Sequence, residues 1–368
     1  MIEHASTLTV GQERQRRTVS KLPRIVVARG PHAVTFSPNG EYAFSDGGNG
    51  IQVQRVGDGQ KKATMGTKIV PTSLAVSNNG KWIAAGMAMG DVHLWDANTY
   101  KQVFVRREDS SDVNGVDFSP DSTRLVAASK SGTATIWEIA TRKQVQTLRH
   151  GDAVFAAKYS PKGDRIATAT RHSVRVYDSN GGRLLVDINV VVTPWYNTGL
   201  VWFIDNLLVV SDGKIKQFEA STGLAVAEWP VPDADRFSCI ALPKHGEFIA
   251  CSTGRTVTFL DTVTHIQLSF IQHPQNIHSI ALSPDDRFLA IAGEDGKTTI
   301  NNLSCVTVCM VSCWVVVHIN KFLFPIISRR VRSLCLVYNP RSRKQAFGSM
   351  TPRSILGSTI NLRMQKYY

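Results

Sequence analysis

Apolar and polar residues alternate along most of the chain, in short runs separated by turn-forming residues. The segment from 115 to 148 shows the pattern clearly, with a Ser131-Gly132 turn near its middle. An alternation of period two is typical of strands with one buried face, whereas a helix repeats every 3.6 residues. The pattern predicts four short antiparallel strands here, covering 115–118, 124–128, 133–137 and 144–148. No sustained helical stripe precedes Leu303.

One short motif recurs along the chain: an apolar residue, Ser-Pro or a close variant, and a polar turn that often ends in Gly. Seven copies, spaced 40 to 43 residues apart, begin at Phe36, Val76, Phe118, Tyr159, Trp202, Leu242 and Leu282. The copy at Trp202 is degenerate. Four strands per repeat at this period describe a β-propeller blade. Because one blade cannot bury both faces of its sheet, seven blades are expected to close into a ring.

The predicted third strands end in an aromatic residue followed by an acid. These dipeptides are Trp95-Asp96, Trp137-Glu138, Tyr177-Asp178 and Phe218-Glu219, with Leu260-Asp261 as an aliphatic variant. In this respect residues 18–303 resemble the WD-repeat β-propellers, which take their name from the dipeptide. The resemblance implies an all-β fold of seven four-stranded antiparallel blades. It also implies a non-catalytic scaffold that presents loop-borne binding sites for other proteins.

The sequence departs from the family pattern at several positions. Gln54 and Asn301 stand where the family usually has the Trp of the first and last repeats. The family joins that Trp to a His and a turn Asp by hydrogen bonds. Candidates for these partners are His32 and His150, and Asp46, Asp212 and Asp295. We therefore expect most blades to hold their shape by apolar packing between sheets rather than by the full polar network.

The seventh copy supplies only three strands and ends near Leu303. The family's usual closure has an N-terminal strand complete the last blade, and Ile25-Val26-Val27 lies in a suitable segment at 19–28. We expect this segment to be the missing outer strand. The domain organisation expected is a disordered N-terminus at 1–17, a propeller at 18–303, and a basic, non-repeat, irregular tail at 304–368.

The net charge of +13 belongs mainly to the tail. From Asn301 to Tyr368 there is no Asp or Glu but there are ten Lys and Arg residues, and the rest of the chain is nearly neutral. Three interpretations of the tail remain open. Leu303 to Ile327 is long enough for a membrane helix if His318 and Lys321 are tolerated. The Arg-rich end could contact nucleic acid or anionic lipid. Alternatively, the tail is mis-translated sequence from the end of the gene model.

The chain shows no catalytic constellation. It has no Gly-x-Ser-x-Gly elbow, no phosphate-binding Walker loop and no HExxH pair, and the glycines near Gly47 join two predicted strands. Six cysteines without a CxxC spacing predict neither a zinc site nor a disulfide framework. We expect no cofactor, no metal and no small-molecule substrate. An enzyme alternative, a propeller resembling the quinone-dependent dehydrogenases, lacks the adjacent cysteines that many of those enzymes carry. The polar N-terminus has no secretory signal, which favours the cytoplasm or nucleus.

Binding residues are sought on the loops, because a rigid scaffold leaves its loops free for recognition. Aromatic residues and Arg are enriched at interfaces. The candidates on loops that lead into blades are Arg106, Arg107, Trp195, Tyr196 and Arg236, and those between second and third strands are Lys130, Arg171 and Arg255. Solvated loops, or edge packing in the case of Trp195 and Tyr196, are the alternatives. The partners expected are one or more proteins or peptides, with nucleic acid or membrane only if the tail is genuine.

Overall fold

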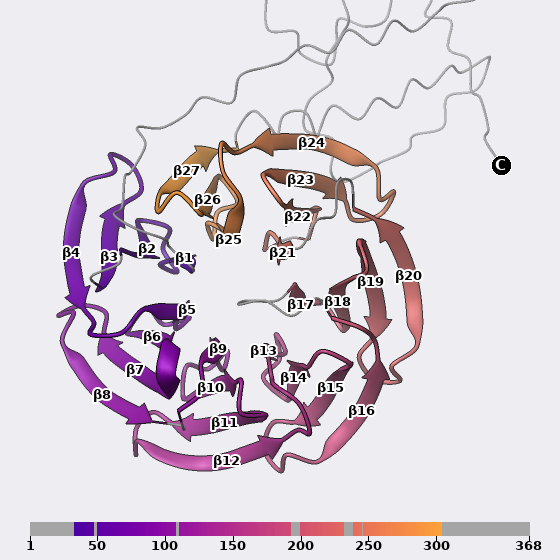
Figure 1. The fold of residues 1–368 in the computed structure, drawn as a ribbon, viewed down its shortest axis with the longest axis horizontal. Coiled ribbons are helices and arrows are strands. Elements are labelled where there is room, and N and C mark those ends of the chain that lie inside the picture. Colours follow the sequence, from indigo (N-terminus) through magenta and orange to yellow (C-terminus); the bar gives the residue numbers. More distant parts are fainter. Residues whose placement is uncertain are drawn as a thin grey trace, which may run out of the picture. The chain divides into compact units, whose positions relative to one another are not determined.

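The computed structural model describes residues 33–47, 50–107, 110–192, 199–231, 238–244 and 246–303. The chain divides after Val306 into two units, and every described residue lies in the first. Seven sheets surround a common axis, and the chain visits them in sequence order (Figure 1). The predicted seven-bladed propeller is therefore confirmed.

The first six blades each contain four antiparallel strands in the order of the chain. Blade 1 consists of β1 (Val34–Phe36), β2 (Tyr42–Asp46), β3 (Gly50–Arg55) and β4 (Lys61–Gly66). Blade 2 consists of β5 (Pro71–Val76), β6 (Trp82–Met87), β7 (Asp91–Asp96) and β8 (Gln102–Arg107), with the short 3-10 helix η1 (Ala88–Gly90) between β6 and β7. Blade 3 consists of β9 (Val113–Phe118), β10 (Arg124–Ser129), β11 (Thr133–Glu138) and β12 (Lys143–Arg149).

The remaining blades repeat this arrangement. Blade 4 consists of β13 (Ala156–Tyr159), β14 (Arg165–Ala169), β15 (Ser173–Asp178) and β16 (Leu184–Asn189). Blade 5 consists of β17 (Leu200–Phe203), β18 (Asn206–Ser211), β19 (Lys214–Glu219) and β20 (Ala225–Pro230). Blade 6 consists of β21 (Ser238–Ala241), β22 (Phe248–Thr253), β23 (Thr256–Asp261) and β24 (Gln267–Gln272), and blade 7 of β25 (Ile277–Leu282), β26 (Phe288–Gly293) and β27 (Thr298–Asn302).

The aromatic-acid dipeptides end the third strands, as the sequence predicted. The pairing of third and outer strands shifts register immediately before the first residue of each dipeptide, for example between Ile136 and Trp137 and between Val176 and Tyr177. Such a bulge bends the strand and increases its twist. The bulge thus recurs at the residue that packs between neighbouring blades.

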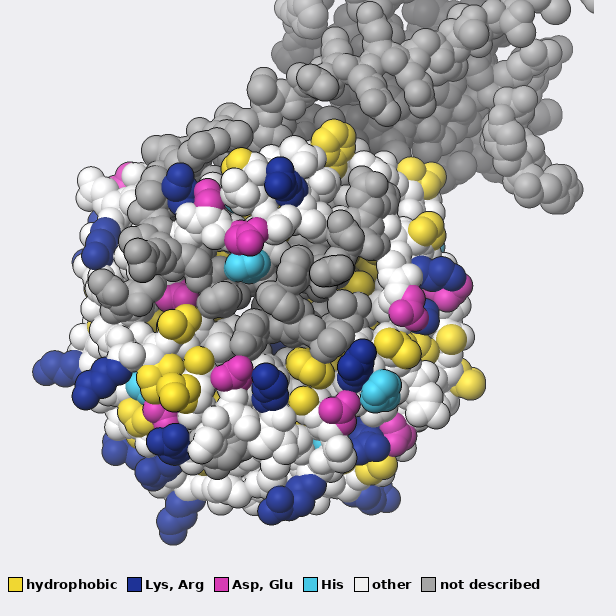
Figure 2. All heavy atoms as spheres, in the orientation of Figure 1, with side chains coloured by type: hydrophobic (Ala, Val, Ile, Leu, Met, Phe, Trp, Pro, Cys, Tyr) yellow, Lys and Arg dark blue, Asp and Glu magenta, His cyan; other side chains and the backbone are white. Residues whose placement is uncertain are grey.

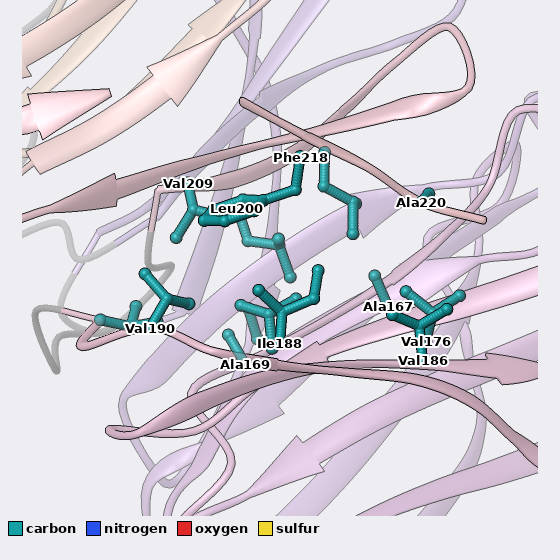
Figure 3. Packing of buried hydrophobic residues seen from close by; sticks show 14 residues of the cluster. Ala167, Ala169, Val176, Val186, Ile188, Val190, Leu200, Val209, Phe218 and Ala220 are labelled. Carbon is teal, nitrogen blue, oxygen red and sulfur yellow. The ribbon is translucent and has the colours of Figure 1, made fainter. Parts of the chain in front are cut away.

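Apolar side chains from facing sheets hold adjacent blades together. Between blades 4 and 5, a cluster of 14 buried residues draws on both sheets. Figure 3 shows side chains of blade 4 directed toward those of blade 5; the labelled examples are Ala167, Ala169, Val176 and Ile188 on one side and Leu200, Val209 and Phe218 on the other. Burying one Val, Leu or Phe stabilises a fold by about 1.5–3 kcal/mol. Apolar packing between sheets is the expected source of stability and is observed.

The polar residues at the family's Trp position are buried in the structure. Gln54 lies in β3 and is 4% exposed, and Asn301 lies in β27 and is 5% exposed. The Asn301 side-chain amide donates to the carbonyl of Leu289 at 3.5 Å. These two blades therefore use an amide where an indole would otherwise pack.

Blade 7 contains three described strands, and the sheet runs from β25 through β26 to β27. The N-terminal segment expected to complete it, 19–28, lies outside the described residues, as do 1–17 and the tail at 304–368. Closure by that segment stays a prediction. Within the described part, no helix is long and apolar enough to cross a membrane.

Candidate functional site

Backbone hydrogen bonds sort the connections onto two faces of the propeller. Connections between second and third strands bond to the connections that join one blade to the next; Lys130 N donates to Asp112 O at 2.9 Å. We call this side the loop face. Turns between first and second strands bond to turns between third and outer strands; Ile139 N donates to Thr123 O at 2.9 Å. We call that side the turn face.

Three predicted binding residues lie on the loop face, in blades 3, 4 and 6. Lys130, Arg171 and Arg255 each occupy a connection between second and third strands, and all three side chains are exposed. Their backbones are fixed by the neighbouring connection, since Val192 N donates to Arg171 O at 2.9 Å and His273 N to Arg255 O at 2.7 Å. The three cationic side chains therefore project from hydrogen-bonded turns on the loop face of the propeller.

The expectation that Arg106 and Arg107 lie on a loop is wrong. Both residues end β8, the outer strand of blade 2, and are exposed on it. The strand continues because Val92 and Asp91 of β7 pair with these two positions. Arg106 sits 5.9 Å from the ring of Phe104 and donates to the carbonyl of Arg142 in the next blade at 3.3 Å. Arg106 thus joins the outer strand of blade 2 to the turn that precedes the outer strand of blade 3.

The remaining candidates, Trp195, Tyr196 and Arg236, fall in the segments 193–198 and 232–237, outside the described residues. Their role stays a prediction.

Sequence reasoning missed an apolar part of the loop face. Met89 in η1 is 59% exposed, and Val70 and Val191 in connections between blades are 41% and 49% exposed. In Figure 2 hydrophobic side chains gather over η1. Ala88 N donates to Val70 O at 3.0 Å, and Met89 N donates to the Asp112 carboxylate at 3.2 Å. The signal was present in the sequence, since the connection Ala88-Met89-Gly90 places a large apolar residue, Met89, between two small ones.

A polar network in blade 4 is more complete than the sequence suggested. His150, in the connection leading into the blade, lies 2.9 Å from Thr168 Oγ1 and 3.2 Å from Tyr177 Oη. Burial, aided by the positive charge of Arg175, lowers the pKa of His150 from 6.5 to about 4. Tyr177 takes the place of the family's Trp, and its ring meets that of His150 edge-on at 5.7 Å. His150 is therefore a neutral, structural residue.

The other expected partners of such networks differ in position. Asp212 lies in a turn with a 67% exposed side chain and an ion pair to Lys216 at 3.9 Å, so it does not enter the interior. His273, which the sequence did not single out, is 4% exposed in the connection leading into blade 7. Its Nδ1 lies 2.9 Å from the carbonyl of Gln275.

The two cysteines of the described part are buried and are not paired with each other. Cys239 and Cys251 are buried free thiols, and burial raises the pKa of Cys239 to about 11 and that of Cys251 further still. Thiols in this state are poor nucleophiles, because the thiolate is the reactive form. Across the described ranges, no three His, Cys, Asp or Glu side chains are grouped so that they could hold a metal ion.

The ring of repeated blades defines a β-propeller. Exposed apolar and cationic side chains lie on the connections of its loop face. A family model described as WD domain, G-beta repeat matches residues 100–138, 142–178 and 265–300. Each match covers the outer strand of one blade and the first three strands of the next. The chain therefore carries WD repeats at these three positions and folds as a seven-bladed β-propeller.

Several curated proteins are similar to the chain over part of its length. The periodic tryptophan protein 2 homolog of Dictyostelium discoideum is 24% identical over 234 residues, which are 62% of this chain and 21% of that protein. The serine-threonine kinase receptor-associated protein of Gallus gallus is 24% identical over 186 residues, 50% of this chain and 52% of that protein. The U3 small nucleolar RNA-associated protein 15 homolog of Xenopus laevis is 23% identical over 229 residues, which are 61% of this chain and 44% of that protein. The matched part spans about half or less of each relative's length.

Proposed function

We propose that the protein is a non-catalytic scaffold that binds other proteins through its loop face. The observation that carries the proposal is the combination of exposed apolar and cationic side chains on connections with fixed backbones. Met89, Val70 and Val191 supply the apolar part, and Lys130 and Arg171 lie on the same face. Because these backbones are already held by hydrogen bonds, binding a partner orders only the side chains, which favours affinity.

The relatives support this proposal at the level of class. Their names refer to a receptor-associated protein and to a small nucleolar RNA-associated protein, and a ribosomal protein of Oryza sativa, RACK1y, is 24% identical over 147 residues. By analogy we propose one or more protein partners within a larger assembly, and a nuclear or cytoplasmic location. The partner itself is to be found by experiment.

The test compares partners captured by full-length wild type with those captured by a loop-face variant. Met89→Asn removes the apolar side chain, and Asn tolerates the left-handed backbone found at this position (φ 70°). Val145→Ser serves as the matched control, because Val145 is also exposed (48%) but lies on the outer strand β12. Each partner recovered by wild type is then purified and titrated against all three proteins.

We expect Met89→Asn to lower the affinity for a purified partner by about tenfold, because removal of an interface anchor costs over 1 kcal/mol of binding free energy. Val145→Ser should bind like wild type. If wild type, Met89→Asn and Val145→Ser bind the partner equally well, binding through the loop face at Met89 is contradicted. Turnover of a substrate by the purified chain would contradict the non-catalytic part of the proposal.

A further inference from the structure

The turn face contains a cleft between blades 1 and 2. Its volume is about 580 Å³, which is within the range of pockets that bind small ligands or short peptide segments. The cleft is bordered by the turns after β1 and β5, by the turn after β7, and by β2 and β4. The residues that matter below are Pro38, Tyr42, Lys62, Gly80 and Tyr100.

The cleft exists because one contact that recurs around the ring is missing. Gly40, Gly80, Gly163 and Gly246 hold the same left-handed position in the turn between first and second strands. A Cβ added to Gly163 would lie 3.2 Å from Pro120 of the preceding blade, and one on Gly246 would lie 2.8 Å from Phe203. A Cβ on Gly80 would meet nothing within 4 Å.

Other junctions of the turn face are also bridged. Lys162 of blade 4 pairs with Asp205 of blade 5 at 3.0 Å, and Lys244 N of blade 6 donates to the Asp286 carboxylate of blade 7 at 3.1 Å. Asn78 of blade 2 donates to the carbonyl of Pro120 in blade 3 at 3.2 Å. Blades 1 and 2 therefore part at this face while their neighbours touch.

The walls of the cleft combine aromatic and amide groups. Tyr42 and Tyr100 pack on the apolar cluster between blades 1 and 2, which includes the buried Phe44, and both rings line the cleft. Burial, reinforced by Tyr42, raises the pKa of Tyr100 above its ordinary value. A tyrosine phenol is protonated at neutral pH, so it can donate a hydrogen bond to a ligand. The lining amides are those of Asn39, Asn78, Asn79 and Asn98. Asn78 Nδ2 donates to Pro120, Asn39 bonds to Glu41, and Asn79 Oδ1 accepts from Ser77 in its own turn, so among the described contacts Asn98 and the Asn79 Nδ2 group are the amides that can face a ligand. Because a side-chain amide both donates and accepts, it matches the groups of a peptide backbone.

The charge of the cleft is unbalanced. Lys62 is its one ionised lining residue, is exposed, and forms none of the ion pairs found among the described residues. Glu41 and Asp96 adjoin the cleft in the sequence but do not line it. Glu41 accepts from Asn39 at 3.0 Å and Asp96 accepts from Thr99 N at 2.7 Å, and these bonds hold the two carboxylates in their own turns without removing their charge. A ligand with a carboxylate would complement Lys62.

From these features we infer that the cleft between blades 1 and 2 binds a short acidic peptide segment of a partner protein. The aromatic walls would take an apolar side chain, the amides the peptide backbone, and Lys62 the carboxylate. The chain's own tail is a poor occupant, because residues 301–368 contain no Asp or Glu. The site lies on the opposite face from the proposed scaffold surface and does not depend on it.

The experiment uses two pools of fluorescein-labelled hexapeptides that differ at one position. The third residue is Glu in one pool and Gln in the other, and all other positions are degenerate without Cys. Each pool is passed over immobilised full-length protein, and the retained fluorescence is measured. We expect wild type to retain about two- to fivefold more of the Glu pool, the preference that a partly exposed ion pair provides.

Two variants test the named residues. Lys62→Gln should reduce the preference for the Glu pool to about one. Tyr100→Gly should reduce retention of both pools, and glycine suits this position because Gly59, Gly182 and Gly223 hold the equivalent left-handed place in other blades. Two controls lie outside the cleft and should behave like wild type. Lys143→Gln removes a lysine charge, and Arg142→Gly introduces glycine at a left-handed position equivalent to that of Tyr100. Arg142 has φ 58°, close to the 56° of Tyr100.

Three results would overturn the inference. They are equal retention of both pools by wild type, a Glu preference that survives Lys62→Gln, and a Glu preference that Lys143→Gln lowers just as much. The last would indicate general attraction of acidic peptides to a basic protein. Met89→Asn, run in parallel, should retain peptides normally, so failure of the cleft and failure of the loop face are distinguishable.

Discussion

The neutral His150 makes the stability of blade 4 depend on pH in a predictable direction. In the folded protein its pKa is about 4, against an ordinary value of 6.5. Between these values the unfolded chain binds a proton at this residue and the folded protein does not. Protons therefore favour unfolding, so the stability that neutral His150 provides is present above about pH 6.5 and is lost as the pH falls toward 4.

The magnitude follows from the two pKa values. Moving from pH 7 to pH 5 should cost the folded state about 2 kcal/mol through His150 alone, on the order of 1.4 kcal/mol for each unit of pKa difference that the pH change spans. Other titrating groups also contribute, and a variant isolates this one. His150→Gln cannot titrate, and its amide can still bond to Thr168.

The assay is urea unfolding followed by tryptophan fluorescence at pH 7, 6 and 5. Wild type should lose about 2 kcal/mol more than His150→Gln between pH 7 and 5. His172→Gln provides the control, because His172 is exposed in the same blade, and it should follow wild type. If wild type and His150→Gln lose the same free energy, His150 is not held neutral by burial and the argument fails.

Three further predictions concern the frame of the propeller. Deleting residues 1–28 should lower the unfolding temperature by several degrees, because the third strand of each of the other six blades pairs with an outer strand. Deleting 1–17 should leave the unfolding temperature almost unchanged. An equal midpoint for wild type and both deletions would refute closure by the N-terminal strand. Gly86→Ala should destabilise the protein by about 1–3 kcal/mol in urea unfolding, since the new Cβ would lie 2.9 Å from the backbone oxygen of Val113, while Gly66→Ala, with nothing within 4 Å, should not. Cys239 and Cys251 should resist iodoacetamide at pH 8 in the folded protein and react in urea, as followed by peptide mass mapping; rapid modification without urea would contradict their burial.

Much of the fold could be predicted from the sequence because a blade is a local structure. The period-two runs, the turn motif and the aromatic-acid dipeptides all lie within 40 or so residues. Together they located all seven copies, including the degenerate one at Trp202, and the four strands of the third copy. The same reasoning placed Lys130, Arg171 and Arg255 on one face, since the connection between second and third strands always emerges on the same side. Position within a repeat was enough for these conclusions.

Contacts between repeats depended on the tertiary structure. His150 meets Thr168 and Tyr177, which lie 18 and 27 residues away, only after blade 4 has formed beside the connection that leads into it. Arg106 and Arg107 continue a strand because β7 offers them partners, which their own sequence does not reveal.

The cleft between blades 1 and 2 shows most clearly what the sequence predicts and what only the tertiary structure determines. The turns at Pro38 and Gly80 have the same pattern as turns that touch elsewhere in the ring, so their sequence predicts two similar turns. Whether they meet depends on how far apart two packed sheets hold them. That separation results from the summed volumes of many buried side chains, and it is a property of the assembled ring rather than of any single repeat.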